Sequence, residues 1–215
     1  MILTIFFDFD GVILDSVSVK TEAFRKMYLK YGQGTADAVV KHHLENGGMS
    51  RYEKFRLYHD LHLNIKLDKK KIENLADIFS SLVVQKVIDS KAIEGALEFI
   101  DQNYDKFNMY IVSGTPQNEM RRIIASLHIE SRFKGVFGSP NQKQTHVDDI
   151  IKDCQYNREE CVFIGDALAD YNAAQENEVK FILVENSNNT DLFKGVNHIY
   201  RMQNLLNLKA FLSEL

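Results

Sequence analysis

The N-terminal stretch LTIFFDFDG, at residues 3–11, is a run of apolar and β-branched residues that ends in two aspartates one residue apart. An unbroken apolar run of this length predicts a strand that is buried on both faces, as the strands of parallel sheets are. Charged groups are costly inside a protein unless something compensates them. Asp8 and Asp10 therefore mark a candidate site, and the compensation we expect is a cation or a reacting phosphate.

Similar short apolar runs recur along the chain, and stretches with helical spacing separate them. Further strands are predicted at residues 109–113, 135–139, 161–165 and 180–185, and helical stretches at 93–103, 117–129 and 145–155. This alternation predicts an α/β domain with a Rossmann-like parallel sheet. In such a sheet, binding and catalytic residues lie beyond the carboxyl ends of the strands.

A long segment from about Asp15 to Ser90 separates the first strand from the second. It is too long for a simple crossover, it is rich in charges, and it contains no convincing strand. The stretches in it that look amphipathic are residues 19–32, 50–63 and 69–88. We therefore predict a small all-helical cap domain at 15–90, inserted into an α/β core formed by 1–14 and 91–215.

The composition narrows the class of partner. Lysine and arginine number 26 against 30 acidic residues, a net charge of −4, so neither nucleic acid nor a membrane surface is an expected partner. No window approaches the roughly 20 apolar residues of a membrane-spanning helix. Cys154 and Cys161 lack the spacing of a zinc site or a disulfide framework, and we expect reduced thiols in a cytoplasmic protein. The oligomeric state is left open.

Asp8 and Asp10 are two residues apart, so their side chains face the same way if the extended geometry continues through Phe9. Two neighbouring carboxylates raise each other's pKa, which suits one ionised nucleophile and one proton carrier. The structural alternative is that Asp10 or Asp15 ends the strand and caps the following helix. That alternative leaves Asp8 unexplained at the edge of a core.

Two more strand ends carry candidate residues. In IVSGTP, Ser113 is followed by Gly114 and Thr115, whose backbone N–H groups predict an anion cradle at the start of the next helix. Lys143 follows the third predicted strand, where a cation would bind a phosphate and offset the repulsion between the aspartates. Taken alone, Ser113 or Thr115 is as readily a helix cap, and Lys143 a solvated loop lysine.

The remaining candidate strand end lies in VFIGDALAD, where Gly165 allows a tight turn and Asp166 and Asp170 have helical i,i+4 spacing. Carboxylates with few neutral competitors favour a hard, oxygen-seeking ion such as Mg²⁺. Asp166 alone would also serve as a helix cap. Together, two acidic pairs, a hydroxyl and a lysine at four strand ends form a complete set for phosphoryl transfer through an aspartyl-phosphate.

In this order and spacing, the motifs resemble those of the haloacid dehalogenase (HAD) superfamily. DFDGV resembles its first motif, SGT its second, Lys143 its third and GDALAD its fourth. The resemblance covers nearly the whole chain. It is to the phosphatase and phosphomutase branch with a helical cap inserted after the first motif, which is phosphoglycolate phosphatase-like or β-phosphoglucomutase-like.

The resemblance implies roles for the motif residues. Asp8 would attack the substrate phosphorus, and Asp10 would protonate the leaving oxygen and then activate water. Ser113 and Lys143 would bind the transferring phosphoryl group. The implied ligands of a Mg²⁺ ion are the Asp8 carboxylate, the Asp10 backbone carbonyl, Asp166 and, directly or through water, Asp170.

Two positions depart from the family pattern. Gln144 follows Lys143 where members commonly have proline, and Lys134 is the nearest alternative lysine. Lys20 stands where similar phosphomutases have a cap-hinge histidine. A phosphomutase is therefore less expected than a phosphatase.

The cap stretch NGGMSRYEKF resembles the substrate-specificity loop of the family. Gly48 would allow close approach of the backbone, and Arg51 would place its fork on an anionic group of the substrate. The alternative for Arg51 is a solvated helix face. With Gly114 and Thr115, these two residues are the candidate substrate-binding residues.

The sequence thus predicts a Mg²⁺-dependent phosphatase that acts on a small phosphorylated metabolite, for example a sugar phosphate, through an aspartyl-phosphate. A phosphomutase remains an alternative and, less expected, so does a non-catalytic binding or regulatory module. The substrate itself is not indicated, because the cap determines it while the chemistry stays in the core.

Overall fold

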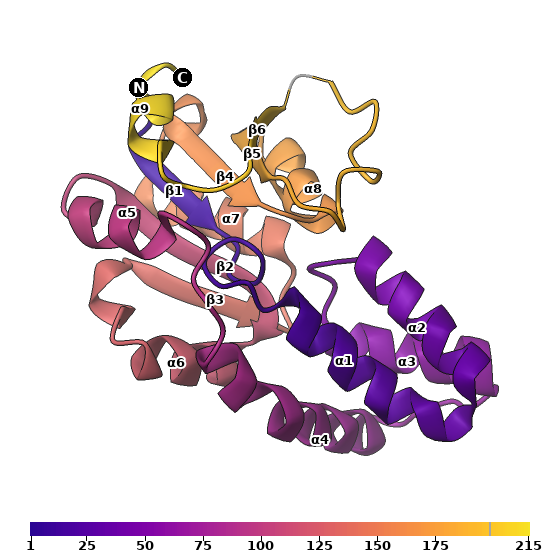
Figure 1. Cartoon of the computed structure of the whole chain (residues 1–215). Helices are drawn as coiled ribbons and strands as arrows, with labels where there is room; N and C mark the ends of the chain where they lie inside the picture. Colours follow the sequence, from indigo (N-terminus) through magenta and orange to yellow (C-terminus); the bar gives the residue numbers. More distant parts are fainter. Residues whose placement is uncertain (198) are drawn as a thin grey trace.

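The computed structural model describes residues 1–197 and 199–215 and shows a sheet flanked by helices, with a further group of helices to one side (Figure 1). The strands in these residues are β1 (Thr4–Phe7), β2 (Asn108–Pro116), β3 (Gly135–Ser139), β4 (Cys161–Gly165), β5 (Lys180–Val184) and β6 (Tyr200–Met202). They pair in the order β3-β2-β1-β4-β5-β6, and each pair is parallel. The predicted α/β class with a Rossmann-like parallel sheet is confirmed.

Strand β1 lies at the point where the strand order changes direction. The chain passes from β1 to β2 and β3 on one side, and then returns to β4, β5 and β6 on the other. Ligands of open α/β sheets bind in the crevice at this point, outside the carboxyl ends of the strands. Because β1 ends at Phe7, Asp8 is the first residue to enter that crevice.

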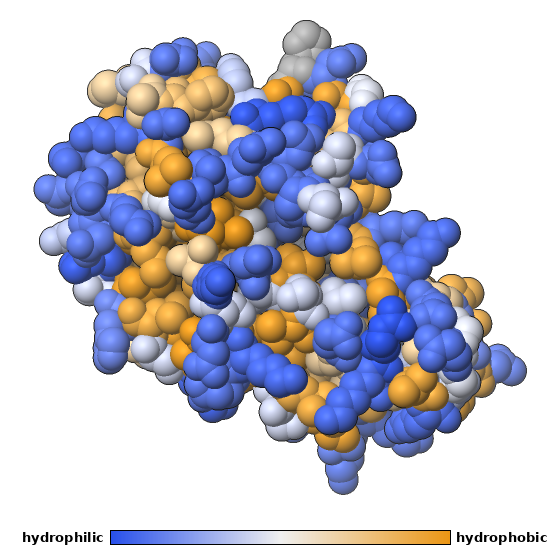
Figure 2. Space-filling model, viewed as in Figure 1, coloured by the Kyte–Doolittle hydropathy of each residue, from blue (hydrophilic) through white to orange (hydrophobic). Residues whose placement is uncertain are grey.

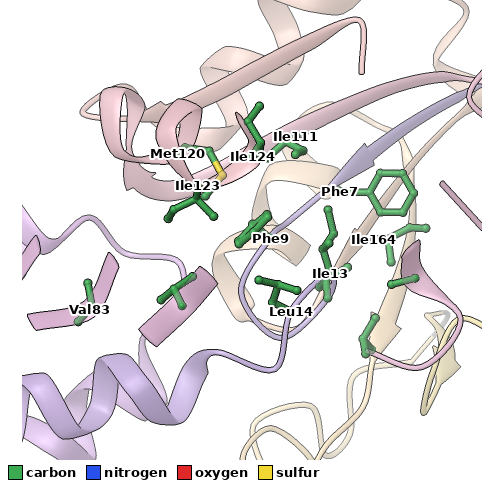
Figure 3. Close-up of a cluster of buried hydrophobic side chains, with 14 of the residues drawn as sticks. Phe7, Phe9, Ile13, Leu14, Val83, Ile111, Met120, Ile123, Ile124 and Ile164 are labelled. Atoms are coloured by element: carbon green, nitrogen blue, oxygen red, sulfur yellow. The ribbon is translucent and has the colours of Figure 1, made fainter. Parts of the chain in front are cut away.

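Helices cover both faces of the sheet, as the apolar run of β1 predicts. Side chains alternate along a strand, so Phe6 and Phe7 lie on opposite faces. Phe7 belongs to the larger buried cluster, part of which Figure 3 shows, with α5 (Ala96–Asn103), α6 (Gln117–Ser126) and α9 (Leu208–Ser213). Phe6 belongs to a second cluster, with α7 (Lys143–Cys154) and α8 (Leu168–Glu176).

The group of helices beside the sheet, which we call the cap, comprises α1 (Val17–Tyr28), α2 (Gln33–Glu45), α3 (Arg51–Leu63) and α4 (Lys69–Ile88) (Figure 1). A short 3₁₀ turn at Leu29–Tyr31 joins α1 to α2. The interior of the cap is aromatic: the ring of Phe24 lies 4.5 Å from that of Phe79 and 5.7 Å from that of Phe55. These rings belong to the same buried cluster as Phe7, so the interior of the cap continues into the hydrophobic core on that face of the sheet.

Strand β6 and the helices α2 and α9 are not predicted from the sequence. Strand β6 has three residues, which are largely exposed and form no apolar run, yet it pairs with β5 at the edge of the sheet. Helix α2 buries Ala36, Val39, Val40 and His43 at helical spacing, but two β-branched residues and a histidine give a weak helical signal. Its burial comes from contact with the other cap helices.

The chain enters and leaves the cap through two connections that lie side by side. The Asp15 N–H donates to the Lys91 carbonyl, and the Ile93 N–H donates to the Ile13 carbonyl, each at 2.9 Å. Val83 of α4 also belongs to the buried cluster that includes α6 (Figure 3). The predicted cap boundaries, 15 and 90, lie next to these connections and stay a prediction.

No helix among residues 1–197 and 199–215 is both long and apolar enough to cross a membrane. Figure 2 shows hydrophilic side chains spread over the sheet-bearing part and the cap, with smaller hydrophobic areas among them. Both cysteines are free thiols, Cys154 exposed and Cys161 buried.

Candidate active site

Asp8 follows directly on β1, and a tight turn comes after it. The Asp8 N–H donates to the Ile164 carbonyl of β4 at 2.9 Å, which holds the residue at the end of the sheet. Gly11 in the turn has φ +81°, and a Cβ there would lie 2.2 Å from Oδ2 of Asp166. Glycine at this position therefore lets Asp166, which follows β4, pack against the turn that follows β1.

Three carboxylates meet at this edge of the sheet. Asp8, Asp166 and Asp170 each bring one carboxylate oxygen within 4.8 Å of the others. Burial and the charge of Asp170 raise the pKa of Asp8 to about 7. Burial and the charge of Asp8 raise the pKa of Asp166 well above its usual value. A further cation beside these carboxylates would favour their ionised forms.

Lys143, the first residue of α7, supplies one cation to the cluster. Its Nζ lies 2.5 Å from Oδ1 of Asp170 and 2.8 Å from Oδ1 of Asp8. Burial lowers the pKa of Lys143, but Asp170 and Asp8 outweigh burial, so the pKa is raised and the ammonium stays charged. The other oxygen of Asp170, Oδ2, accepts the Ala167 N–H at 3.0 Å.

The donors of this cluster fit a hard divalent cation. Oδ1 of Asp8 is buried and accepts no well-directed hydrogen bond within the described part of the chain, although Nζ of Lys143 is close. One lysine does not balance three carboxylates, and carboxylate oxygens are the ligands that Mg²⁺ prefers. The predicted ligands Asp8, Asp166 and Asp170 are thus brought together by the fold.

Asp10 has different surroundings from Asp8. Ser16 Oγ donates to its Oδ1 at 2.6 Å, Thr115 Oγ1 donates to its Oδ2 at 3.1 Å, and Lys20 forms an ion pair with Oδ2. Burial raises the pKa of Asp10, but Lys20 and the hydroxyl donors outweigh burial, so the pKa is lowered. The sequence singles out Lys20 only because similar phosphomutases have a histidine there. Its contact with Asp10 depends on how α1 packs against the turn after β1, which the sequence does not indicate.

Ser113, Gly114 and Thr115 lie at the end of β2, beside the turn after β1. Ser113 is buried, and its Oγ accepts the Thr115 N–H at 3.1 Å. Helix α6 begins at Gln117 and no side chain caps it, so Ser113 is not a helix cap. A Cβ on Gly114 would lie 2.4 Å from the carbonyl oxygen of Gly48, so the cap loop rests directly on this strand end.

The simpler alternatives for Asp166 and Lys143 do not describe their positions. The residue before α8 is Ala167, so Asp166 is not the N-cap of that helix. Lys143 is buried rather than solvated. The other lysine considered, Lys134, is exposed and precedes β3, at the opposite edge of the sheet from the carboxyl ends.

Arg51 begins α3 and is buried, so it is not on a solvated helix face. Its guanidinium donates to both carboxylate oxygens of Glu119 in α6, at 2.6 and 2.9 Å, and to Ser80 Oγ of α4 at 2.9 Å. It also lies over the ring of Phe79, 4.5 Å from the centroid. The fork that was expected to meet a substrate anion is thus occupied by a core carboxylate.

A cavity with about 780 Å³ of empty space, including its opening to solvent, lies between the sheet end and the cap. Asp8, Asp10, Asp166, Gly114 and Thr115 line it from the core, and Lys20, His43, Gly48, Arg51 and Lys54 line it from the cap. His43, Lys54 and Glu119 are not recognisable from the sequence, because no motif marks them and only packing brings them to this place.

Comparison with known proteins places the chain in a family. Residues 5–184 match the family of haloacid dehalogenase-like hydrolases, and the chain belongs to this family. A search of curated proteins finds no match. The family assignment agrees with the resemblance of the four motifs.

Solved structures share this fold at low sequence identity. A protein of Clostridium acetobutylicum described as a predicted phosphatase has a TM-score of 0.77 at 16% identity, covering 100% of both chains. β-Phosphoglucomutase of Clostridium difficile has a TM-score of 0.77 at 19% identity, covering 100% of this chain and 96% of its own. The protein YfnB of Bacillus subtilis, bound to magnesium and with movement between its domains, has a TM-score of 0.72 at 19% identity over 99% of both chains.

Proposed function

We propose that this haloacid dehalogenase-like hydrolase is a Mg²⁺-dependent phosphatase of a small phosphorylated metabolite and that it works through a phosphorylated Asp8. One observation carries the proposal. The carboxylate of Asp8 is buried at the end of β1 with Nζ of Lys143 at 2.8 Å, and it lines the same cavity as Asp10. A nucleophile, a cation for the phosphoryl group and a proton carrier therefore lie at one place.

The proposed reaction has two halves. In the first, a carboxylate oxygen of Asp8 attacks the phosphorus and the bond to the leaving oxygen breaks, while Asp10 donates a proton to that oxygen. The alcohol departs, and Asp8 carries the phosphoryl group. In the second, Asp10 accepts a proton from a water molecule whose oxygen attacks the phosphorus, the Asp8–phosphate bond breaks, and inorganic phosphate leaves.

Lys20 favours the second half of this reaction. Burial raises the pKa of Asp10, but the ion pair with Lys20 and the hydroxyl donors outweigh burial, so the pKa is lowered. Asp10 is therefore ionised and can accept a proton. The first half needs the proton on Asp10. A phosphate dianion bound beside Asp10 would raise its pKa and so favour that state.

We propose that Ser113 and Lys143 bind the phosphoryl group. The proposed ligands of Mg²⁺ are the Asp8 carboxylate, the Asp10 backbone carbonyl and Asp166. Both oxygens of Asp170 already accept hydrogen bonds, so we propose that Asp170 acts on the ion through water. When bound, Mg²⁺ would neutralise charge on the phosphate and on Asp8.

We propose that the substrate contacts Gly48, Gly114 and Thr115 in the cavity. Arg51 also lines the cavity, but its fork would have to leave Glu119 to reach an anion. We therefore propose that Arg51 holds the cap against the core while the site is closed over a substrate. Closure of this kind excludes water from the reaction.

A screen of phosphorylated metabolites for phosphate release tests this function. We expect release that requires Mg²⁺, that EDTA stops and that added Mg²⁺ restores. Sugar phosphates should be assayed for isomerisation in the same screen, because the resemblance includes phosphomutases. Absence of both reactions over a broad panel, with p-nitrophenyl phosphate included, would contradict the proposal and favour a non-catalytic module.

Direct binding of Mg²⁺ is a second readout. We expect Mg²⁺ to raise the melting temperature of the wild type, because the ion binds the folded state and relieves the repulsion in the cluster. Asp166→Ala should reduce this rise. Glu176→Ala, on the exposed surface at the end of α8, is the matched control. An equal rise in the wild type and in Asp166→Ala would contradict the assignment of Asp166 to the ion.

A further inference from the structure

Lys54 of α3 is a buried cation at the cavity without an opposite charge. Its side chain is 2% exposed, and no carboxylate among residues 1–197 and 199–215 lies within 4.0 Å of its Nζ. The partner of Nζ is His43 of α2, through Nδ1 at 2.8 Å and the backbone carbonyl at 3.4 Å. Burying a charge without compensation is costly, so its presence needs a reason.

Lys20 and Arg51, which also line the cavity, and Lys143, which lies beside Asp8, differ from Lys54 in this respect. Lys143 lies against Asp8 and Asp170, Lys20 pairs with Asp10, and Arg51 pairs with Glu119. Burial, assisted by Lys20 and Arg51, lowers the pKa of Lys54 to about 7. An anion beside it would reverse this shift.

His43 offers a second donor at the same place. When Lys54 is protonated its ammonium group can only donate, so Nδ1 of His43 accepts from it and the ring proton is on Nε2. His43 is 7% exposed, and its Nε2 has no hydrogen-bond partner in the described part of the structure. Both residues line the cavity that also contains Asp8. A buried donor without an acceptor, next to a buried cation without an anion, indicates a ligand.

We propose that Lys54 and His43 form an anion subsite in the cap, which binds a second acidic group of the substrate while its phosphate lies at Asp8. The subsite selects phosphorylated carboxylic acids or bisphosphates over phosphate esters that are otherwise neutral. This inference narrows the substrate class and rests on the proposed function for its cleavable phosphate. The natural second group is a carboxylate or a phosphate, and both present the anionic oxygens that the two donors need.

Non-hydrolysable phosphonates test the subsite by calorimetry in the presence of Mg²⁺. Carboxyalkyl phosphonates with two to four carbons between the acidic groups are compared with alkyl phosphonates of the same length, and α,ω-bisphosphonates form a third arm. We expect the second acidic group to tighten binding by about ten- to a hundredfold at the best length, the scale of a charge-assisted hydrogen bond. The arm with the larger gain identifies a carboxylate or a phosphate as the second group.

Lys54→Met keeps most of the length of the side chain and removes its charge. In this variant the preference for the second acidic group should fall below about threefold, and in His43→Phe it should fall several-fold. Lys41→Met, an exposed cap lysine with 77% of its side chain accessible, is the matched control and should keep the wild-type preference. Lys54→Met should melt at or above the wild-type temperature, since it loses a buried charge.

The outcomes separate the subsite from the proposed function. Hydrolysis of p-nitrophenyl phosphate by the wild type, with no preference for a second acidic group at any length, would overturn the subsite and leave the phosphatase standing. A preference that vanishes in Lys54→Met, without hydrolysis of any ester, would support the subsite and overturn the phosphatase. A preference retained in Lys54→Met, or a large loss of stability in that variant, would identify a structural lysine and overturn the subsite.

Discussion

The two sides of the cavity lack charges of opposite sign: the sheet side lacks positive charge, and the cap side lacks negative charge. On the sheet side, Asp8, Asp166 and Asp170 lie together, and Lys143 is the only cation within 4.0 Å of their carboxylates among the described residues. On the cap side, Lys54 lies against the neutral ring of His43 and has no carboxylate within contact distance among the described residues. The pKa of Asp8 is raised to about 7 and that of Lys54 is lowered to about 7, and burial is the largest cause of both shifts.

This difference indicates what each side lacks. In both places burial disfavours the charged form, and the neighbouring charges of the protein do not offset that cost. A metal cation would complete the sheet side, and an anionic group would complete the cap side. A substrate with two acidic groups, bound together with Mg²⁺, would supply both at once, and this is why we treat the two deficits as halves of one site.

The largest effect should come from Asp8→Asn, which removes the proposed nucleophile from the sheet side. We expect turnover to fall by about 10⁴-fold or more, because an amide is a poor nucleophile. Folding should survive, since the change relieves repulsion within the acidic cluster. Steady-state phosphate release is the measurement. Near-normal activity, with deamidation back to aspartate excluded by mass spectrometry, would break the assignment of the chemistry to this side.

The contact between Arg51 and Glu119 joins the two sides and should have the next largest effect. Removing one partner of a buried ion pair leaves the other uncompensated, so Arg51→Met should lower the free energy of unfolding by about 3–5 kcal/mol. Denaturant unfolding is the measurement. The double variant Arg51→Met with Glu119→Gln should be more stable than Arg51→Met alone. If the two losses simply add, the pair does not couple cap to core.

The sheet side could be predicted from the sequence because Asp8, Ser113 and Asp166 lie at or just after the end of a strand. The apolar runs before Asp8, Ser113 and Asp166 are short and unbroken, and the parallel sheet they predict has all carboxyl ends at one edge. Knowing the strands was therefore enough to bring these residues together. The position of Lys143 is harder to predict, because this residue lies on the first turn of α7 rather than at the strand end itself.

The cap side could not be predicted in the same way. Lys54 is in a stretch whose charges suggest a solvated helix face, and His43 is on α2, which has a weak helical signal. Their contact depends on how α2 and α3 pack, and no local pattern encodes that. Arg51 was identified from its loop, but its partner Glu119 is 68 positions away, in a core helix.

Asp10→Asn tests the carboxylate of the sheet side that has its own cation, Lys20, apart from the cluster around Lys143. Loss of proton transfer should reduce kcat by about a hundredfold. The loss in the first half should be smaller for p-nitrophenyl phosphate than for an alkyl phosphate, since nitrophenolate leaves without a proton. Burst kinetics measure that half separately. Equal losses for both leaving groups would mean that Asp10 does not protonate the leaving oxygen.

The charge deficit of the cap side should also make the free energy of unfolding depend on pH. In the free protein, burial, Lys20 and Arg51 lower the pKa of Lys54 from its usual 10.5 to about 7, with Asp10 opposing and Lys143 adding to the shift. His43 next to it is held neutral, because burial lowers its pKa well below the usual value. Between pH 7 and 10.5 the unfolded chain therefore binds more protons at Lys54 than the folded chain does.

Stability of the wild type should accordingly contain a contribution that rises with pH over this window, and Lys54→Met should lack it. The variant should be more stable than the wild type at pH 7, and its advantage should shrink toward pH 10. Urea unfolding at several pH values measures the difference, with Lys41→Met as the control that shows no such trend. A constant difference between Lys54→Met and the wild type would mean that Lys54 keeps an ordinary pKa in the folded state. In that case its charge is already compensated, and the contrast between the two sides of the cavity would not hold.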